Sequence, residues 1–203
     1  MYIVSYYRAL PKLEDTEETD TAQLIVNFLE ATKPKLILDA GSGSGYFSKR
    51  FGKKIISLDI DPERLKLISG KKINASITDI PLKNESVDAV VAKDVIEHVD
   101  LQDAFEFLHE ARRILRVGGF LLITTLKNTQ QFWDKPDHIR PYSNKWIARI
   151  ATKEMSGFKI LQRFDLPRGI PGIGILHLEW LTKLLVKLFP DLSDHGLIIL
   201  QKL

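Results

Sequence analysis

Three segments of the chain carry residue types and spacings that could support chemistry. The first is glycine-rich and begins with an acid, residues 39–45 (DAGSGSG). The second is 94–98 (DVIEH), in which one helical turn would place both carboxylates and the imidazole on a shared face. The third is 137–142 (DHIRPY). The first could approach a ligand through its backbone, and the other two could move protons or hold charge.

The glycine-rich segment follows an apolar strand and precedes a helix, where open parallel sheets bind ligands at the carboxyl ends of their strands. Asp59 ends the next predicted strand, twenty residues after Asp39, at the spacing where a carboxylate can take the two hydroxyls of a ribose. Asp79 follows the third predicted strand. We therefore expect the three acids to line one elongated pocket. A tight turn beside a solvated acid is the alternative for the glycines alone.

Three interpretations of the segment 94–98 stay open. His98 could act as a general base near neutral pH, with Asp94 beside it. Asp94, Glu97 and His98 could instead ligate a divalent ion. In the third interpretation, Glu97 and His98 only order the loop after the fourth strand. The third is favoured, and no metal is assigned, because one cluster of this kind without a second ligand group is thin evidence.

The segment 137–142 combines a base with a possible anion-binding group. His138 could act as a base, and Arg140 could grip an anionic group with two parallel hydrogen bonds. An ordinary loop anchor explains the same residues. Residues 127–168 hold nine Lys or Arg against four Asp or Glu, which favours a negatively charged acceptor, although a solvated face would look similar.

Composition removes whole classes of mechanism. The chain has 203 residues and no Cys, so it can form neither a disulfide nor a thiolate zinc site, and it has no cysteine nucleophile. The net charge of +3 does not by itself indicate nucleic-acid binding. Residues 1–20 contain Arg8 and an acidic run, so we expect neither a signal peptide nor a membrane span. A cytoplasmic monomer or homodimer is the expectation.

The elements that must position these segments alternate between short apolar runs and helical patterns. Strands are predicted at 36–40, 55–58, 73–77, 87–92, 120–125, 158–164 and 196–200. Helices are predicted at 21–32, 46–51, 61–69, 101–115, 142–155 and 175–189. Residues 78–86 are expected to return across the sheet without a helix. Apolar strands interleaved with helices predict an α/β doubly wound domain with a mostly parallel sheet covered on both faces.

Four motifs occur in order along the chain: ILDAGSGSGYF, ISLDIDPERL, TDIPLKNESVDAVVAKDVIEHV and RILRVGGFLLITT. In these motifs the sequence resembles the class I S-adenosylmethionine-dependent methyltransferases, in particular the type-11 group of small-molecule methyltransferases. The resemblance implies a Rossmann-like, three-layer α/β/α fold whose seven strands have the order 3-2-1-4-5-7-6, with strand 7 antiparallel. It implies one methyltransferase domain over 1–203, with a helical cap at 1–34, a cofactor-binding core at 35–126 and a substrate side at 127–203.

The resemblance also implies S-adenosyl-L-methionine as the cofactor and S-adenosyl-L-homocysteine as its product. Asp39, through the backbone of its neighbours, would hold the methionine amino group, and Asp59 would take the ribose hydroxyls. Ile60 would pack on the adenine, while Asp79 and the Ile80 backbone would read its edge. The implied cofactor-binding residues are Asp39, Ala40, Gly41, Ser42, Gly43, Gly45, Asp59, Ile60, Asp79, Ile80, Lys93 and Asp94.

Around the acceptor, the resemblance adds two further points. Segments similar to 94–98 ligate a metal in ubiquinone-biosynthesis O-methyltransferases and small-RNA 2'-O-methyltransferases. Segments with the His-x-Arg-x-Tyr pattern of 138–142 lie where type-11 chains fold over the acceptor. Arg140 and Tyr142 are therefore the candidate substrate-binding residues, and His98, Asp94 and His138 are the candidate catalytic ones.

The leading expectation is in-line transfer of a methyl group to a small-molecule acceptor that is anionic or partly apolar. The apolar segment 170–189 could cover such an acceptor through Ile173, Leu176, Trp180 and Phe189, although core packing and dimerisation would use the same face. One alternative keeps the fold and cofactor but makes tRNA or rRNA the acceptor. A second alternative is a non-catalytic, methyltransferase-like binding scaffold.

Overall fold

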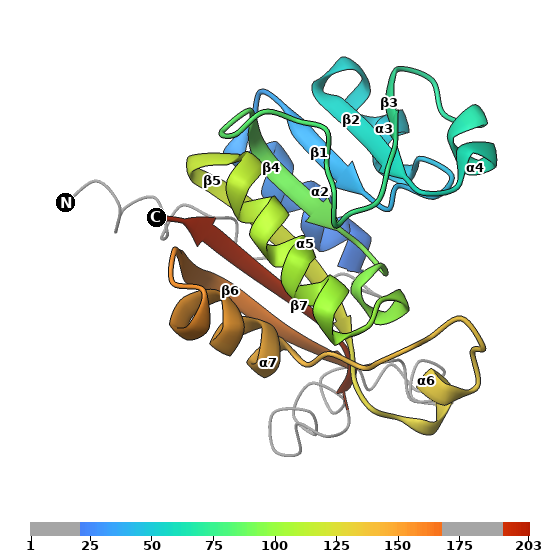
Figure 1. Cartoon of the computed structure of the whole chain (residues 1–203), viewed down its shortest axis with the longest axis vertical. Helices are drawn as coiled ribbons and strands as arrows, with labels where there is room; N and C mark the ends of the chain where they lie inside the picture. Colours follow the sequence, from blue (N-terminus) through green and yellow to red (C-terminus); the bar gives the residue numbers. More distant parts are fainter. Residues whose placement is uncertain (1–20, 168–192) are drawn as a thin grey trace, which may run out of the picture.

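The apolar runs of the sequence become neighbouring strands of a single sheet in a computed structural model, which describes residues 21–167 and 193–203 (Figure 1). The seven strands have the order β3-β2-β1-β4-β5-β7-β6, as expected. Strands β1 to β5 pair in parallel, and β7 runs antiparallel to both of its neighbours. The strands are β1 (Ile37–Ala40), β2 (Ile55–Asp59), β3 (Lys71–Asn74), β4 (Val87–Ala92), β5 (Leu115–Leu126), β6 (Phe158–Pro167) and β7 (Ser193–Lys202).

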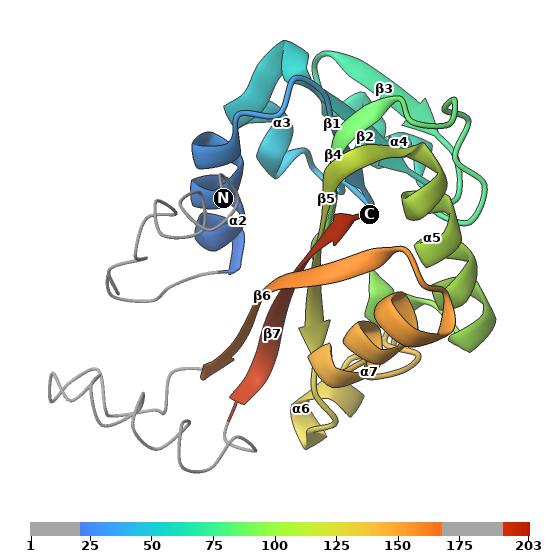
Figure 2. The ribbon, with the colours of Figure 1, turned by 90° about the vertical axis from the view of Figure 1, so that its left-hand side faces the viewer.

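Helices cover both faces of this sheet and give the expected three layers (Figure 2). The helices are α2 (Thr21–Thr32), α3 (Tyr46–Phe51), α4 (Pro62–Lys66), α5 (Leu101–Ile114), α6 (Gln130–Trp133) and α7 (Asn144–Arg149). Figure 2 shows α2 and α3 on one side of the sheet, with α5 and α7 on the other. Short 3-10 turns add Gly52–Lys54 and Ile96–His98, and a π-helical turn at Ile150–Glu154 continues α7.

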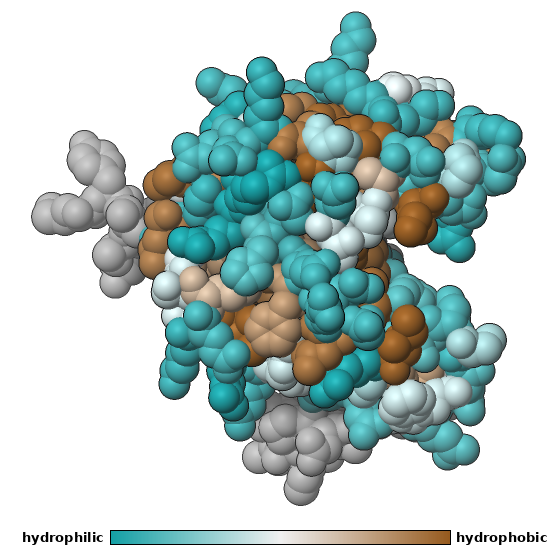
Figure 3. All heavy atoms as spheres, viewed as in Figure 1, coloured by the Kyte–Doolittle hydropathy of each residue, from teal (hydrophilic) through white to brown (hydrophobic). Residues whose placement is uncertain are grey.

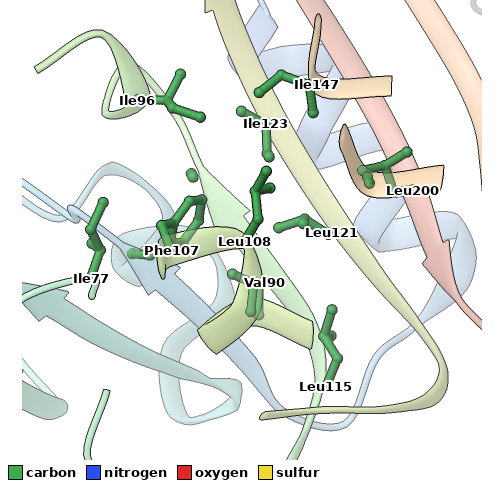
Figure 4. Packing of buried hydrophobic residues seen from close by; sticks show 14 of the residues in the cluster. Ile77, Val90, Ile96, Phe107, Leu108, Leu115, Leu121, Ile123, Ile147 and Leu200 are labelled. Carbon is green, nitrogen blue, oxygen red and sulfur yellow. The ribbon is translucent and has the colours of Figure 1, made fainter. Parts of the chain in front are cut away.

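Each face of the sheet buries its own apolar cluster. On the α5 side, Phe107 and Leu108 pack against the strand residues Val90 and Leu121, and Ile147 of α7 joins them (Figure 4). On the other side, α2 buries the face that carries Phe28, whose ring stands edge-on to Phe120 of β5. A strand that is buried on both faces needs a continuous apolar run, which explains the sequence pattern of β1, β2 and β4.

The predicted third strand at 73–77 is wrong in its position. The strand is Lys71–Asn74, and all but one of its residues are exposed because β3 is an edge of the sheet. Ile77 and Ile80 are buried, but they lie in the loop after the strand and pack into the core that α5 covers. The apolar residue that ends the predicted strand is therefore a buried residue of a loop. Because β3 ends earlier than predicted, the residues that follow its end are also different ones.

Other boundaries also differ from the prediction, three of them in ways that concern the course of the chain. The helix predicted at 61–69 ends at Lys66, and the one predicted at 142–155 divides into α7 and the π-helical turn. Ser143 caps α7, since its hydroxyl accepts the Trp146 N–H. Strand β5 begins earlier than predicted, at Leu115, and continues through the double glycine. None of these differences changes the order of the strands.

The connection from β3 to β4 contains no helix, as predicted. Two residues of α5 hold it against the sheet. The Glu110 carboxylate accepts the Ile80 N–H at 2.8 Å, and Arg113 donates to the carbonyls of Ile80 and Leu82 at 2.8 and 2.7 Å. Arg113 also pairs with Glu110 at 2.6 Å. This network fixes a segment that lacks regular structure of its own.

Strands β1, β2 and β4 end on the same side of the molecule, toward α6 (Figure 1). The surface is hollowed on that side, and apolar side chains stand around the hollow (Figure 3). None of the helices within 21–167 and 193–203 has the length and apolar character to cross a bilayer. Three predicted features lie outside the described residues: the helix at 175–189, the acidic run before α2, and the covering residues Ile173, Leu176, Trp180 and Phe189.

Candidate active site

The glycine-rich segment folds over the end of β2, directly after β1. The N–H groups of Gly41 and Ser42 both donate to the Leu58 carbonyl, at 2.7 and 2.9 Å. Gly41, Gly43 and Gly45 have φ angles of 75°, 52° and 80°. These left-handed conformations favour glycine, so the alternating glycines are required by the path of the loop.

The three glycines differ in what surrounds them. A Cβ atom at Gly41 would lie 2.4 Å from Val95 Cγ2, and one at Gly45 would lie 2.6 Å from Ser48 Oγ. At Gly43 the nearest atom would be 4.0 Å away. The protein itself therefore fills the space beside the outer two glycines, whereas Gly43 borders open space where a ligand could approach the backbone.

Asp39 is a buried carboxylate without a hydrogen-bond partner among the described residues. Its side chain is 2% exposed, and Oδ2 forms no hydrogen bond with any described residue. Burial raises the pKa of Asp39 to about 7, the nearby Asp59 adds to this rise, and Lys93 opposes it. A buried carboxylate in this state suits a ligand that brings a positive charge or hydrogen-bond donors.

Asp59 fixes the loop and keeps capacity for a ligand. Its Oδ2 accepts the Gly43 N–H at 2.8 Å, and its Oδ1 accepts the Asp61 N–H at 2.9 Å. Each carboxylate oxygen has a second lone pair, so two hydroxyl donors could still bind. Ile60, the next residue, is 74% exposed. A large apolar side chain at the rim of a polar pocket suits contact with a flat ring of a ligand.

The residues expected to read the adenine edge do not both face the pocket. Asp79 is exposed, but Ile80 is 1% exposed and its N–H is already donated to Glu110. The structure therefore does not leave the Ile80 backbone for a ligand. Ser76 and Ile77 stand closer to the end of β3, and the Ile77 N–H has no hydrogen-bond acceptor among the residues described. Sequence reasoning missed this pair because it placed the strand end too late.

Lys93 and Asp94 follow β4 and are tied to their surroundings. Lys93 Nζ forms an ion pair with the Asp94 carboxylate. Thr124 of β5 accepts the Asp94 N–H at 2.7 Å and lies 3.1 Å from Asp94 Oδ1. Asp94 has a φ of 55°, an unusual conformation for a residue with a side chain, and these contacts hold it.

The two segments that carry histidines meet in the fold, although about forty residues separate them. Three potential metal-ligand atoms converge here, a carboxylate oxygen of Glu97 and one ring nitrogen each of His98 and His138. They all lie within 4.8 Å of one another. The two imidazole rings are 5.1 Å apart between centroids. The Glu97 carbonyl accepts the N–H groups of Ile139 and Arg140 at 2.8 and 3.2 Å. Asp94, which the sequence grouped with Glu97 and His98, is not part of this convergence.

Burial dominates the electrostatics of this cluster. Glu97 is 1% exposed, and Oε2 has no hydrogen-bond partner in the described chain. Burial raises the pKa of Glu97 to about 7, and Asp94 adds to the rise, whereas the Glu97 N–H, His98 and Lys93 oppose it. Burial lowers the pKa of His138, and the neighbouring His98 contributes in the same direction.

A pocket of about 440 Å³ opens beside the cluster. It is lined by Asp100, Leu101, Trp133, Ile139, Arg140 and Pro141. Most of these residues are apolar, and within the described chain the Arg140 guanidinium forms no ion pair. It lies 5.9 Å from the centre of the Tyr142 ring. Among its described lining residues, the pocket therefore offers an apolar wall and one available cation, Arg140.

Tyr142 supports this pocket from inside the protein. It is 1% exposed, and its hydroxyl donates to the Val99 carbonyl at 3.1 Å. Burial raises the pKa of Tyr142 to about 12. The phenol is thus neutral at physiological pH and is already engaged with the backbone, so among the two candidate substrate-binding residues Arg140 is the one with free donors.

Comparisons with known proteins agree with this arrangement. The sequence model of a family described as "Methyltransferase domain" matches residues 38–123. A malonyl-[acyl-carrier protein] O-methyltransferase from Hamiltonella defensa is 30% identical over 72% of this chain and 66% of its own length. An uncharacterised protein from Methanocaldococcus jannaschii is 30% identical over 77% of this chain and 69% of its own. The chain therefore spans about two thirds of the length of these two relatives.

Solved structures share the whole fold at lower identity. A SAM-dependent methyltransferase from Archaeoglobus fulgidus superposes with a TM-score of 0.69 at 18% identity, covering 99% of both chains. An N-methyltransferase from Bradyrhizobium japonicum, in complex with S-adenosyl-L-homocysteine, superposes with a TM-score of 0.65 at 13% identity. It covers 98% of this chain and 97% of that one. At these identities the likeness concerns the fold.

Proposed function

The chain belongs to the class I S-adenosylmethionine-dependent methyltransferases of the type-11 group, and from that premise we propose that it methylates a small, partly apolar acceptor that carries an anionic group. The observation that carries the proposal is the pairing of two sites at one sheet edge. One has a buried carboxylate without a hydrogen-bond partner among the described residues, beside an open glycine backbone, and the other is an apolar pocket in which Arg140 forms no ion pair with a described residue.

The residues of the first site fit the cofactor. Asp39 would accept from the methionine ammonium, and Asp59 would accept from the ribose hydroxyls with its remaining lone pairs. Ile60 would cover one face of the adenine, and the Ile77 N–H would meet its edge in place of Ile80. The loop at Gly43 lets the ligand reach the backbone.

The cofactor supplies a methyl group that is already activated on a sulfonium, so the chain has mainly to hold the acceptor in line with it. The segment around Arg140 is suited to this because the Glu97 carbonyl anchors its backbone. We assign the core, residues 35–126, to cofactor binding. We assign the part 127–203 to the choice of acceptor, and residues 1–34 to the N-terminal cap of the same domain.

A pair of glycine variants tests the cofactor site. Gly43 and Gly52 have nearly the same φ, 52° and 54°, and open space surrounds both positions. Gly52 follows α3 and precedes β2, at the other end of that strand. Calorimetric titration with S-adenosyl-L-homocysteine should show at least about tenfold weaker binding for Gly43→Val than for Gly52→Val, because both positions have a positive φ but only the side chain added at Gly43 would stand where the ligand approaches the backbone. Equal affinities in the two variants would refute the assignment.

A second measurement tests the acceptor site. One relative is named for O-methylation of a malonyl group, which is an anionic acyl group, and this supports a carboxylate-bearing acceptor. Methyl transfer to a panel of acyl carboxylates would be measured with the radiolabelled cofactor, and their neutral amides would be measured as competitive inhibitors. Arg140→Gln should raise KM for carboxylates at least about tenfold and leave inhibition by the neutral amides unchanged, because it removes a charge-assisted contact. The control is Lys145→Gln, which removes an exposed cation of the same basic segment.

No observation on the described chain favours an RNA acceptor over a small molecule, and the intact glycine loop gives no support to a scaffold without cofactor.

A further inference from the structure

The cluster of Glu97, His98 and His138 has the composition and convergence of a metal site. Its three ligand atoms lie within 4.8 Å of one another. Atoms bound about 2.1 Å from one ion lie at most about 4.2 Å apart. Side-chain rotations that move an atom by less than about 1 Å would therefore close the cluster around an ion.

Hydrogen bonds hold both imidazoles in the form that a metal needs. His98 Nδ1 lies 2.9 Å from the Asp137 carbonyl, and His138 Nδ1 lies 3.0 Å from the Phe132 carbonyl. A carbonyl can only accept, so each Nδ1 carries the hydrogen when the ring is neutral. The lone pair is then on Nε2 of both rings. Metal-binding histidines are characteristically oriented by a backbone carbonyl or carboxylate in this way, and Asp137 Oδ2 also lies 3.5 Å from His98 Nδ1.

Glu97 provides an independent observation. Its carboxylate is inside the protein, and Oε2 has no partner among the residues described. Leaving a carboxylate oxygen buried without a partner is costly, and a cation offsets the cost. The adjacent cation Lys93 is already paired with Asp94. The described side chains therefore supply no cation that would compensate the Glu97 carboxylate.

We propose that Glu97, His98 and His138 bind one divalent first-row transition-metal ion, through the carboxylate and the two Nε2 atoms. Two imidazoles and one carboxylate favour an ion such as Zn²⁺, Fe²⁺ or Ni²⁺ over Mg²⁺ or Ca²⁺, which prefer ligand sets of oxygen alone. Three protein ligands leave coordination positions for water or another oxygen ligand. Asp94 is not a ligand in this site, in contrast to the set that sequence spacing suggests.

The test uses Co²⁺ as a spectroscopic probe on the full chain after treatment with a chelator. Neither cofactor nor acceptor is needed, so the result is independent of the proposed function. The wild-type chain should develop visible Co²⁺ absorption that saturates at one ion per chain and is displaced by Zn²⁺. Glu97→Gln and His138→Gln should each raise the Co²⁺ Kd at least about tenfold. Thermal unfolding by circular dichroism would confirm that these variants fold.

Two further variants keep the test decisive. His109→Gln removes an exposed histidine of α5 and should leave the Co²⁺ titration unchanged. Asp94→Asn should also retain the absorption, because its carboxylate does not converge on the site. If either ligand variant fails to fold, His98→Gln replaces it, since that side chain is 34% exposed. Absence of a saturable spectrum in the wild type overturns the proposal, as does binding that is lost in Asp94→Asn but retained in His138→Gln.

Discussion

Replacing Asp39 by Asn should stabilise the cofactor-free protein, and the gain should depend on pH. The carboxylate is almost fully buried, and burial raises its pKa from 3.8 to about 7, with a smaller contribution from Asp59 in the same direction and an opposing one from Lys93. Asparagine has a similar shape and carries no charge. The variant therefore removes the cost of ionising a buried group while it preserves most of the packing.

The size of the effect follows from linkage. The folded protein binds the Asp39 proton more tightly than the unfolded chain, so the free energy of unfolding falls as pH rises from about 4 to about 7 and then stays low. A shift of about three pKa units lowers the free energy of unfolding by about 4 kcal/mol at a pH well above both pKa values. Between pH 5 and pH 8 the difference in the free energy of unfolding between variant and wild type should grow by about 3 kcal/mol. This is less than the full effect, because part of it is already present at pH 5.

Urea denaturation of both proteins at pH 5, 6.5 and 8, without cofactor, would measure this difference. Asp88→Asn is the matched control, because Asp88 has the opposite electrostatics. Burial opposes ionisation there, but the hydrogen bonds from Arg116 and from the Leu36 N–H outweigh it and lower the Asp88 pKa. That control should therefore lose about the same stability at all three pH values, because the pKa of Asp88 is 3.8 in the unfolded chain and lower in the folded protein, below the range measured. A stability difference for Asp39→Asn that is the same at pH 5 and pH 8 would refute the reasoning.

Three other substitutions have defined outcomes. Gly41→Ala should lower the free energy of unfolding by about 3 kcal/mol in urea titrations, because its Cβ would overlap Val95 and its φ is positive; a loss below about 1 kcal/mol would contradict this. Glu110→Ala should cost about 2 kcal/mol and speed hydrogen exchange at the Ile80 amide, because it removes the acceptor of that N–H; unchanged exchange would show that the bond is dispensable. Tyr142→Phe should cost about 1 kcal/mol and leave the pH profile of methyl transfer unchanged between pH 6 and pH 9, since the pKa of the phenol is about 12; an altered profile would assign the phenol a chemical role.

Much of the fold could be predicted because its determinants are local. Apolar runs that are buried on both faces and glycines with positive φ leave direct marks in the sequence. The boundaries of α3 and β4 were predicted to the residue. The third strand was misplaced because an edge strand does not need an apolar run. The loop after it contains apolar residues instead, since Ile77 and Ile80 pack under α5. The same error displaced the predicted adenine contacts.

The sequence by itself determined which segments meet at the carboxyl edge of the sheet. Parallel strands joined by crossovers must all end on one side, so the acids at the ends of β1 and β2, Asp39 and Asp59, had to be neighbours. Their expected roles as ligands of the cofactor stay predictions for the titrations above.

Only the tertiary structure decided the properties that depend on contacts between distant segments. His138 reaches Glu97 and His98 because the segment after β5 is bound to the Glu97 carbonyl, and no spacing in the sequence encodes that bond. The pKa of Asp39 likewise depends on how completely other elements remove it from water. Sequence patterns specify which faces are buried, whereas the desolvation and partners of a single polar atom are properties of the assembled fold.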